Sequence, residues 1–250
     1  VDGVSRTVSA NYRNYSQFTT NSSQFDTTTA ALGVDYGWPL SEFQSVRVGL
    51  AAQRSDLFTD PNQSAEQSLV WVQNNGNTYT RKSTVGVPPI AFTYYGTRFD
   101  TFLLSAGWGY DSRNRALFAT GGARHWLNFG YTAPGSDVEF YSLSYEWLQF
   151  VPLGRWLTIM NNFEVGYGND FGSTTSIPPY RNFFAGGAES VRGFRASTLG
   201  PKDTFGNPYG GNTKLTNQFE LLLPMPEKFR NSARFSLFFD AGNVFSNDHV

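Results

Sequence analysis

The alternation of apolar and polar side chains along this chain limits its fold more than any other feature. In the stretch 137–151, one side of the pattern carries Tyr141, Leu143, Tyr145 and Trp147. The other side carries Ser142, Ser144 and Glu146. Because neighbouring side chains of a strand point to opposite faces, such a stretch predicts a β-strand with one apolar and one polar face. The pattern recurs in nine segments, at 4–17, 27–39, 43–56, 99–111, 123–132, 137–151, 155–168, 212–223 and 233–245.

Composition decides which kind of β-protein suits this pattern. Among 250 residues, 17% are aromatic and only 16% are charged, and the mean hydropathy is -0.36. Apolar faces toward lipid that alternate with polar faces toward a lumen produce this mixture, so we predict an all-β fold, a transmembrane antiparallel β-barrel. A soluble β-sandwich is the alternative. The net charge of -1 argues against a nucleic-acid partner, and the absence of cysteine excludes a disulfide framework.

The lengths of the strands and of their connections suit an outer-membrane barrel. Each segment has about ten residues or more, which is enough to cross a bilayer at a tilt. Tyr36 and Trp38, at the end of one segment, suit an interfacial aromatic girdle. Shorter or proline-marked connections at 40–42, 112–122, 152–154 and 224–232 alternate with those at 18–26, 57–98, 133–136 and 169–211, two of which are very long. This asymmetry is typical of short periplasmic turns and long extracellular loops.

Two details of this layout stay open. In the connection 57–98, Ser64 and Gln67 resemble a capping box ahead of residues 69–72, which predicts a short helix, although an irregular loop fits equally well. Nine strands do not close an antiparallel barrel, because the first and the last would run parallel. An open edge in lipid leaves backbone groups unpaired, at several kcal/mol each. We therefore expect either that further strands outside this chain complete the barrel, or that this chain by itself is not inserted in a bilayer.

Two carboxylates and one arginine are the candidate functional residues. In the last two segments the alternation turns Glu220 and Asp240 toward the lumen from adjacent strands. The connection 169–211, directly before them, carries Val191-Arg192-Gly193-Phe194. A guanidinium forms strong, often bidentate hydrogen bonds with carboxylates. We predict that this loop folds into the barrel, that Arg192 pairs with Glu220, Asp240 or both, and that Phe194 wedges against lumen residues. The alternative leaves both acids solvated and Arg192 exposed.

Glycines around this motif permit the tight backbone that an inward loop needs. They are Gly186, Gly187, Gly193 and Gly200.

Enzymatic sites find little support in the sequence. His125 and His249 are far apart and have no companions at ligand spacing, so neither a metal site nor a catalytic triad is predicted. The glycine-rich loop matches no phosphate-binding loop, because no helix pattern follows it. Glu146 and Glu164 lie on neighbouring inward faces and resemble a carboxylate pair, but acids that face lumen water are far more common. We therefore expect no enzyme, no cofactor and no metal.

A resemblance to a known family rests on the same loop. The run Phe184-Ala-Gly-Gly-Ala-Glu-Ser-Val-Arg-Gly-Phe-Arg-Ala-Ser-Thr-Leu-Gly-Pro201 resembles the sixth extracellular loop of a superfamily of outer-membrane assembly and two-partner-secretion barrel proteins. The segments 217–226 and 238–244 look like the two strands that follow that loop. The segment 111–122 is similar to a periplasmic turn of the family, although Ala119 stands where proline is usual. The flanking Gly-Gly and Leu-Gly-Pro indicate the assembly proteins within this superfamily. The resemblance extends in order over essentially all 250 residues.

The resemblance implies a sixteen-strand barrel in the bacterial outer membrane, preceded by periplasmic domains. By this comparison, residues 1–250 are the central portion of the membrane barrel. They lack the periplasmic domains, the first four strands and the last three strands, and therefore also the lateral gate, which forms where the first and last strands of the barrel meet. The implied function is nucleotide-independent folding and insertion of other β-barrel proteins. The implied partners are the lipid bilayer, unfolded outer-membrane clients and accessory lipoproteins bound through the periplasmic domains. The alternatives are a translocation pore of the two-partner-secretion or TamA type and a passive porin.

Overall fold

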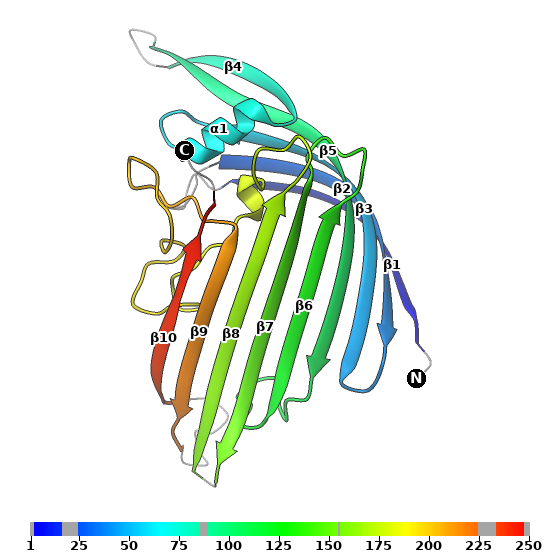
Figure 1. The fold of residues 1–250 in the computed structure, drawn as a ribbon, viewed down its shortest axis with the longest axis vertical. Coiled ribbons are helices and arrows are strands. Elements are labelled where there is room, and N and C mark those ends of the chain that lie inside the picture. The colour runs from blue at the N-terminus through cyan, green and yellow to red at the C-terminus, as the bar shows by residue number, and fades with distance from the viewer. Residues whose placement is uncertain (1–2, 17–24, 86–89, 155, 225–233, 248–250) are drawn as a thin grey trace.

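The fold is one curved antiparallel sheet that wraps around a concave side. A computed structural model describes residues 3–16, 25–85, 90–154, 156–224 and 234–247 (Figure 1). The strands are β1 (Ser5–Ser16), β2 (Phe25–Pro39), β3 (Gln44–Thr59), β4 (Asn77–Val85), β5 (Ile90–Asp111), β6 (Gly122–Thr132), β7 (Phe140–Leu153), β8 (Leu157–Asp170), β9 (Thr213–Leu222) and β10 (Ser236–Phe245). All pairs are antiparallel, in the order β1-β2-β3-β5-β6-β7-β8-β9-β10, and β4 pairs with β5 beside this path. The predicted all-β class is confirmed.

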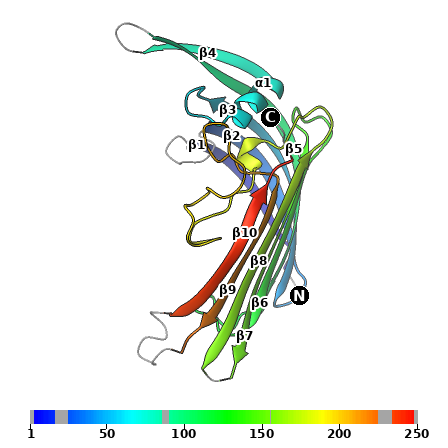
Figure 2. The same cartoon turned by 60° about the vertical axis from the view of Figure 1, so that its left-hand side comes forward.

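The connection 57–98 is the main correction to the predicted strand pattern. It contains the end of β3, helix α1 (Glu66–Asn74) and a hairpin formed by β4 and the first half of β5. Figure 2 shows this hairpin projecting beyond the rest of the sheet. Residues 77–82 are polar or exposed on both sides, so a strand here has no apolar face and the alternation that marks the other strands is missing.

The predicted helix is present, but the predicted capping box is wrong. Ala65 is the N-cap of α1 and no side chain caps the helix there. The hydroxyl of Ser64 instead accepts a hydrogen bond from the backbone N–H of Asp60 at 2.9 Å. The Ser64 hydroxyl therefore stabilises the turn before the helix. Ser64 also precedes the N-cap position, Ala65, by one residue, so it does not cap the helix. None of the helices in the described part of the chain is long and apolar enough to cross a membrane.

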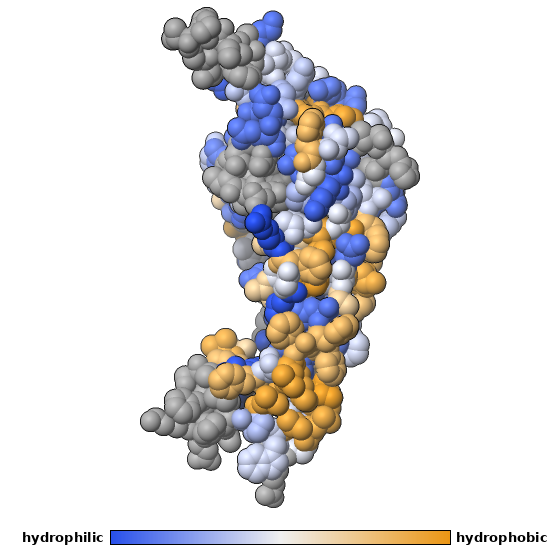
Figure 3. All heavy atoms as spheres, turned by 90° about the vertical axis from the view of Figure 1, so that its left-hand side faces the viewer, coloured by the Kyte–Doolittle hydropathy of each residue, from blue (hydrophilic) through white to orange (hydrophobic). Residues whose placement is uncertain are grey.

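The two faces of the sheet differ in chemistry as the alternation predicts. Strand register places Glu164 opposite Glu146 and opposite Thr216, so these residues share the concave face. The convex face carries exposed apolar side chains, among them Leu143, Trp147, Leu215, Phe219, Leu237 and Phe239. In Figure 3 hydrophobic residues gather over the lower half of the view, away from the hairpin. An exposed apolar face of this extent suits contact with lipid.

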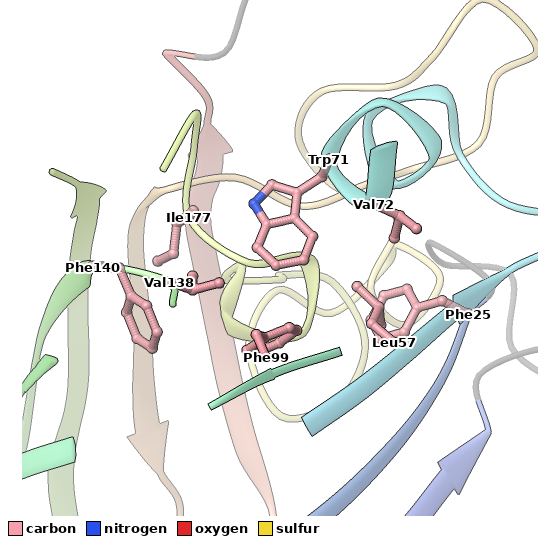
Figure 4. Close-up of a cluster of buried hydrophobic side chains, with 8 residues drawn as sticks. All are labelled: Phe25, Leu57, Trp71, Val72, Phe99, Val138, Phe140 and Ile177. Atoms are coloured by element: carbon pink, nitrogen blue, oxygen red, sulfur yellow. The ribbon is translucent and has the colours of Figure 1, made fainter. Parts of the chain in front are cut away.

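The main buried cluster closes one end of the sheet. We call this the loop end, because the long connections lie there; the opposite end, with the connections 40–43 and 112–121, is the turn end. The cluster contains Phe25, Leu57, Trp71, Val72, Phe99, Val138, Phe140 and Ile177. Figure 4 shows Trp71 and Val72 pointing from α1 into it. Burial of these side chains fixes α1 and the segment around Ile177 over the end of the sheet.

Candidate functional site

The segment 171–212, between β8 and β9, forms the site. It lies on the concave side of the sheet, yellow to orange in Figure 2. Its own structure is limited to the 3-10 turn η1 (Pro179–Arg181) and isolated bridges such as Ala185 to Leu199. Helix α1 holds it from above, because the indole N–H of Trp71 donates to the carbonyl of Ser176 at 2.9 Å.

Glycine is required at particular points of this segment. At Gly186 φ is +108°, and an added Cβ would lie 2.4 Å from the carbonyl oxygen of Arg195. At Gly200 φ is +104°, and an added Cβ would lie 2.9 Å from Cβ of Val244 on β10. Both positions combine a left-handed backbone with a close approach that a side chain would block. The predicted glycines Gly187 and Gly193 also have positive φ, at +93° and +91°.

Arg192 lies against both predicted acids. Its Nε donates to Oδ2 of Asp240 at 2.7 Å, and its Nη2 donates to Oδ1 of the same carboxylate at 2.6 Å. The backbone N–H of Arg192 also donates to Oδ2, at 2.9 Å. The third guanidinium nitrogen, Nη1, donates to Glu220. Asp240 is thus held in a bidentate, charge-assisted pair, and we call Arg192, Glu220 and Asp240 the loop lock.

The strand register positions the residues that contact Arg192. On β9 and β10, Glu220 lies opposite Phe238, and Asp240 lies opposite Gln218. The two carboxylates therefore occupy diagonal positions on the concave face, with the ring of Phe238 beside both. The guanidinium carbon of Arg192 is 3.8 Å from the centroid of that ring, a cation–π contact. The alternation put Phe238 on this face, but its contact with Arg192 depends on the path of the loop.

The lock is largely shielded from solvent. Exposed side-chain fractions are 21% for Arg192, 13% for Glu220 and 2% for Asp240. Hydrogen bonds to Asp240 and Glu220 raise the pKa of Arg192, although burial opposes the shift. Arg192 therefore stays charged, and its removal would leave two shielded carboxylates without their cation.

The two hydrophobic residues of the motif have opposite surroundings. Val191 is buried, with 2% exposure. Phe194 is 55% exposed, so the predicted wedge of Phe194 against lumen residues is wrong. The carbonyl of Phe194 accepts a hydrogen bond from the Gly187 N–H at 3.1 Å.

Two further carboxylates on the concave face, Glu146 and Glu164, are paired with cations. Glu146 and Glu164 lie directly opposite each other, as predicted from their inward faces. Arg124 forms an ion pair with Glu146, and Lys214 forms one with Glu164. Each carboxylate has its own cation, which is not the arrangement of a catalytic acid and base.

His125 is the histidine that the structure describes. His125 lies on the convex face, opposite Trp147 in the register, and its Nδ1 is 2.8 Å from the hydroxyl of Tyr145. His249 lies outside the described residues. Among the described residues, no group of three or more His, Cys, Asp or Glu is placed to hold a metal ion.

Comparison with known proteins identifies the family. The model of the Omp85 superfamily domain matches residues 1–249. The chain belongs to the Omp85 superfamily. This Omp85 barrel is 36% identical over 232 residues to the outer membrane protein assembly factor BamA of Neisseria meningitidis serogroup B, which is 90% of this chain and 27% of that protein. The resemblance inferred from the loop is confirmed.

A solved structure supports the same assignment. The crystal structure of BamA from Haemophilus ducreyi lacking POTRA domains 1–3 matches with a TM-score of 0.82 and 26% identity, over 98% of this chain and 47% of that chain. The Omp85 barrel described here therefore spans about half of that solved chain and about a quarter of the curated relative. In outer-membrane barrels the long loops are extracellular and the short turns periplasmic, so the loop end is the extracellular end.

Proposed function

We propose that the parent of this chain is a bacterial outer-membrane insertase that folds other β-barrel proteins into the membrane. The observation that carries the proposal is the loop lock, in a barrel that is 36% identical to an outer-membrane protein assembly factor. An extracellular loop fastened to the inner wall obstructs the lumen, which a passive porin must keep open. A secretion pore must move this loop aside, and a bidentate pair with a carboxylate that is 2% exposed opposes that movement.

The proposed activity needs neither a nucleotide nor a catalytic residue. The driving force is burial of the client's apolar surface in lipid, together with completion of its backbone hydrogen bonds. We propose that the protein is not an enzyme and that its partners are the bilayer, unfolded client barrels and accessory lipoproteins. The role of the lock is to keep the wall formed by β9 and β10 in one shape while strands elsewhere in the barrel separate and pair with the client.

Reconstitution of the full-length parent in lipid vesicles tests this function. An unfolded outer-membrane client is added outside, and its folding is followed by the shift in gel mobility of the unheated sample. We expect faster client folding, with the product embedded in the vesicle membrane. A client that is protected inside the vesicles would indicate a translocation pore, and solute flux without client folding would indicate a porin.

Two matched variants connect this activity to the lock. Arg192→Ala is expected to slow client folding by about tenfold, because the substitution removes the shielded, charge-assisted hydrogen bonds of the loop lock. Arg195→Ala removes an exposed arginine three residues away and is expected to match the unmodified protein. Equal rates for both variants would show that the lock does not contribute to client folding.

A further inference from the structure

The periplasmic turn between β5 and β6 folds back into the lumen. Ala119, in this turn, is 2% exposed and packs with Phe150 of β7 and Leu222 of β9. Leu222 pairs with Thr158 across β8 and β9, which places this small cluster on the concave face at the turn end. A connection that served only to join two strands would be expected to lie in water.

The backbone of this turn is strained into its position. Phe118 has φ of +54°, a left-handed conformation that is unusual and strained for a bulky residue. Asn114 secures the turn by accepting the N–H of Thr120 at 3.1 Å and donating to its hydroxyl at 2.9 Å. The strain is maintained because the surrounding contacts determine where Phe118 and Ala119 lie.

Arg234 supplies the contact from the far side of the lumen. Its Nη2 donates to the carbonyl oxygen of Ala119 at 2.7 Å. Its guanidinium carbon lies 5.2 Å from the ring centroid of Phe118 and 5.9 Å from that of Phe150. Arg234 lies just before β10, whereas the turn joins β5 to β6, and β7, β8 and β9 separate these elements in the sheet. One half-buried side chain thus bridges elements that the sheet keeps apart.

On the concave face of β9, Glu220 is the next residue along from Leu222, which packs against Ala119 of the turn. It accepts a hydrogen bond from Arg192 of the extracellular loop. Its negative charge also acts on Arg234: burial lowers the pKa of Arg234, and Glu220 opposes that shift. One face of β9 therefore carries both a carboxylate of the loop lock and a contact of the periplasmic turn.

We propose that Arg234 is a positioning residue that holds the turn 112–121 inside the periplasmic mouth of the lumen, and that Glu220 couples this contact to the loop lock. The lumen is thereby obstructed from both ends against the same two strands, β9 and β10. Release of the extracellular loop weakens the periplasmic contact, and release of the turn weakens the loop lock. These contacts set the state of the lumen in the resting protein, independently of the insertion of clients.

Cysteine labelling of the full-length parent in vesicles tests the proposal. Residues 1–250 contain no cysteine, and cysteines elsewhere in the parent would first be replaced by serine. Ala119→Cys is the reporter because Ala119 is 2% exposed, and Leu117→Cys is its matched control in the same turn because Leu117 is 78% exposed. The readout is the rate of reaction with a membrane-impermeant maleimide applied from the periplasmic side.

Opening of the turn should raise the labelling rate of the buried Ala119→Cys and not that of the exposed Leu117→Cys. Arg234→Ala is expected to raise the labelling rate of Ala119→Cys by about tenfold, because the turn loses its charge-assisted contact and opens more often. Arg234→Lys keeps a donor but loses the planar stacking on Phe118 and Phe150, so a rise of about threefold is expected. Leu117→Cys should react at one rate in every background.

The coupling has its own readout. Arg192→Ala is expected to raise labelling of Ala119→Cys by about threefold, and Arg195→Ala is expected to leave it unchanged. Combined with Arg234→Ala, the Arg192→Ala change should add nothing further, because the two changes remove one coupled contact.

Two results would overturn the proposal. Unchanged protection of Ala119→Cys in Arg234→Ala would show that Arg234 does not hold the turn. Release by Arg234→Ala without any effect of Arg192→Ala would show that Glu220 carries no coupling. Folding of each variant is checked by gel mobility, and if Arg234→Ala does not fold, Arg234→Lys decides the first question. Labelling does not depend on insertase activity, so failure of the proposed function leaves this test intact.

Discussion

At the scale of single residues, Asp240 determines the strength of the loop lock. Its carboxylate is 2% exposed and accepts two guanidinium bonds and one backbone bond from Arg192. Removal of one partner of a desolvated charge pair costs about 3–5 kcal/mol, and less where water enters. Because Arg192 keeps 21% exposure, we expect Arg192→Ala to lower the free energy of unfolding of the full-length barrel by about 2–4 kcal/mol. Urea denaturation in lipid, followed by tryptophan fluorescence, measures this.

The control for this prediction is Arg195→Ala, which should stay within about 0.5 kcal/mol of the unmodified protein. Arg192→Lys should recover only part of the loss, because an ammonium group cannot reproduce the bidentate geometry. Equal stability of Arg192→Ala and Arg195→Ala would contradict the assigned strength of the lock.

Alanine substitutions at two glycines of the same segment distinguish the cost of backbone strain from the cost of steric overlap. Gly186 and Gly206 both have positive φ, at +108° and +85°, but an added Cβ at Gly206 meets nothing within 4 Å. We expect Gly206→Ala to cost about 1–2 kcal/mol from the left-handed backbone alone. Gly186→Ala should cost about 1–3 kcal/mol more, because its Cβ overlaps the Arg195 carbonyl. The same denaturation series compares them, and equal costs would show that the close approach relaxes freely.

The sequence predicts part of this site for a definite physical reason. Glu220 and Asp240 follow from alternation along a strand, which depends only on the backbone. Arg192 follows from the demand of two inward acids for a cation. The exposure of Phe194 and the ring contact of Phe238 depend on the path of the segment 171–212, and no local pattern records that path.

At the scale of elements, strands with one face in lipid are predictable and strands without such a face are not. The predicted segment 123–132 differs from β6 by one residue. β4 shows no apolar alternation in the sequence, because its side chains make polar contacts: the hydroxyl of Tyr79 donates to Asp56 at 2.6 Å, and Arg98 donates to the same carboxylate at 2.8 Å. Register and hydrogen bonding hold β4 without an apolar face, whereas in the β5 half of the hairpin Tyr94 stacks on Phe58 at 5.4 Å.

Helix α1 is held by packing, and this gives a prediction at its own scale. Trp71 is 2% exposed and meets the ring of Phe99 edge-on at 5.6 Å. We expect Trp71→Ala to cost about 3–5 kcal/mol through the cavity that it leaves. Trp71→Phe should cost less, since it mainly loses the hydrogen bond to Ser176. Val70→Ala, on the exposed side of the same helix, is the control.

Limited proteolysis of the extracellular face would report detachment of α1 directly. Cleavage of the segment 171–212 should become faster in Trp71→Ala and stay slow in Val70→Ala, because Trp71 joins the helix to that segment. Slow cleavage in both variants would show that the helix and the segment are held independently of this side chain.

At the scale of the whole molecule, the described sheet has two open edges. Within the described residues, β1 pairs only with β2, and β10 pairs only with β9. Unpaired strand edges are templates for other strands, both in aggregation and in β-augmentation of a client. The proposed insertase uses such an edge in a controlled way, at a seam between strands that the closed barrel can open. Residues 1–250 alone offer edges without that control.

We therefore expect residues 1–250 alone not to accelerate client folding, although the full-length parent does. The isolated segment should form oligomers through β1 and β10, because backbone groups left unpaired in lipid cost several kcal/mol each. A vesicle assay with one unfolded client, at equal molar amounts of segment and parent, measures both rates, and crosslinking in the same samples measures oligomerisation. Equal acceleration by the segment would show that any exposed barrel edge is sufficient for insertion. A seam between particular strands would then no longer be needed, and the lock would act only on the stability of the wall that carries it.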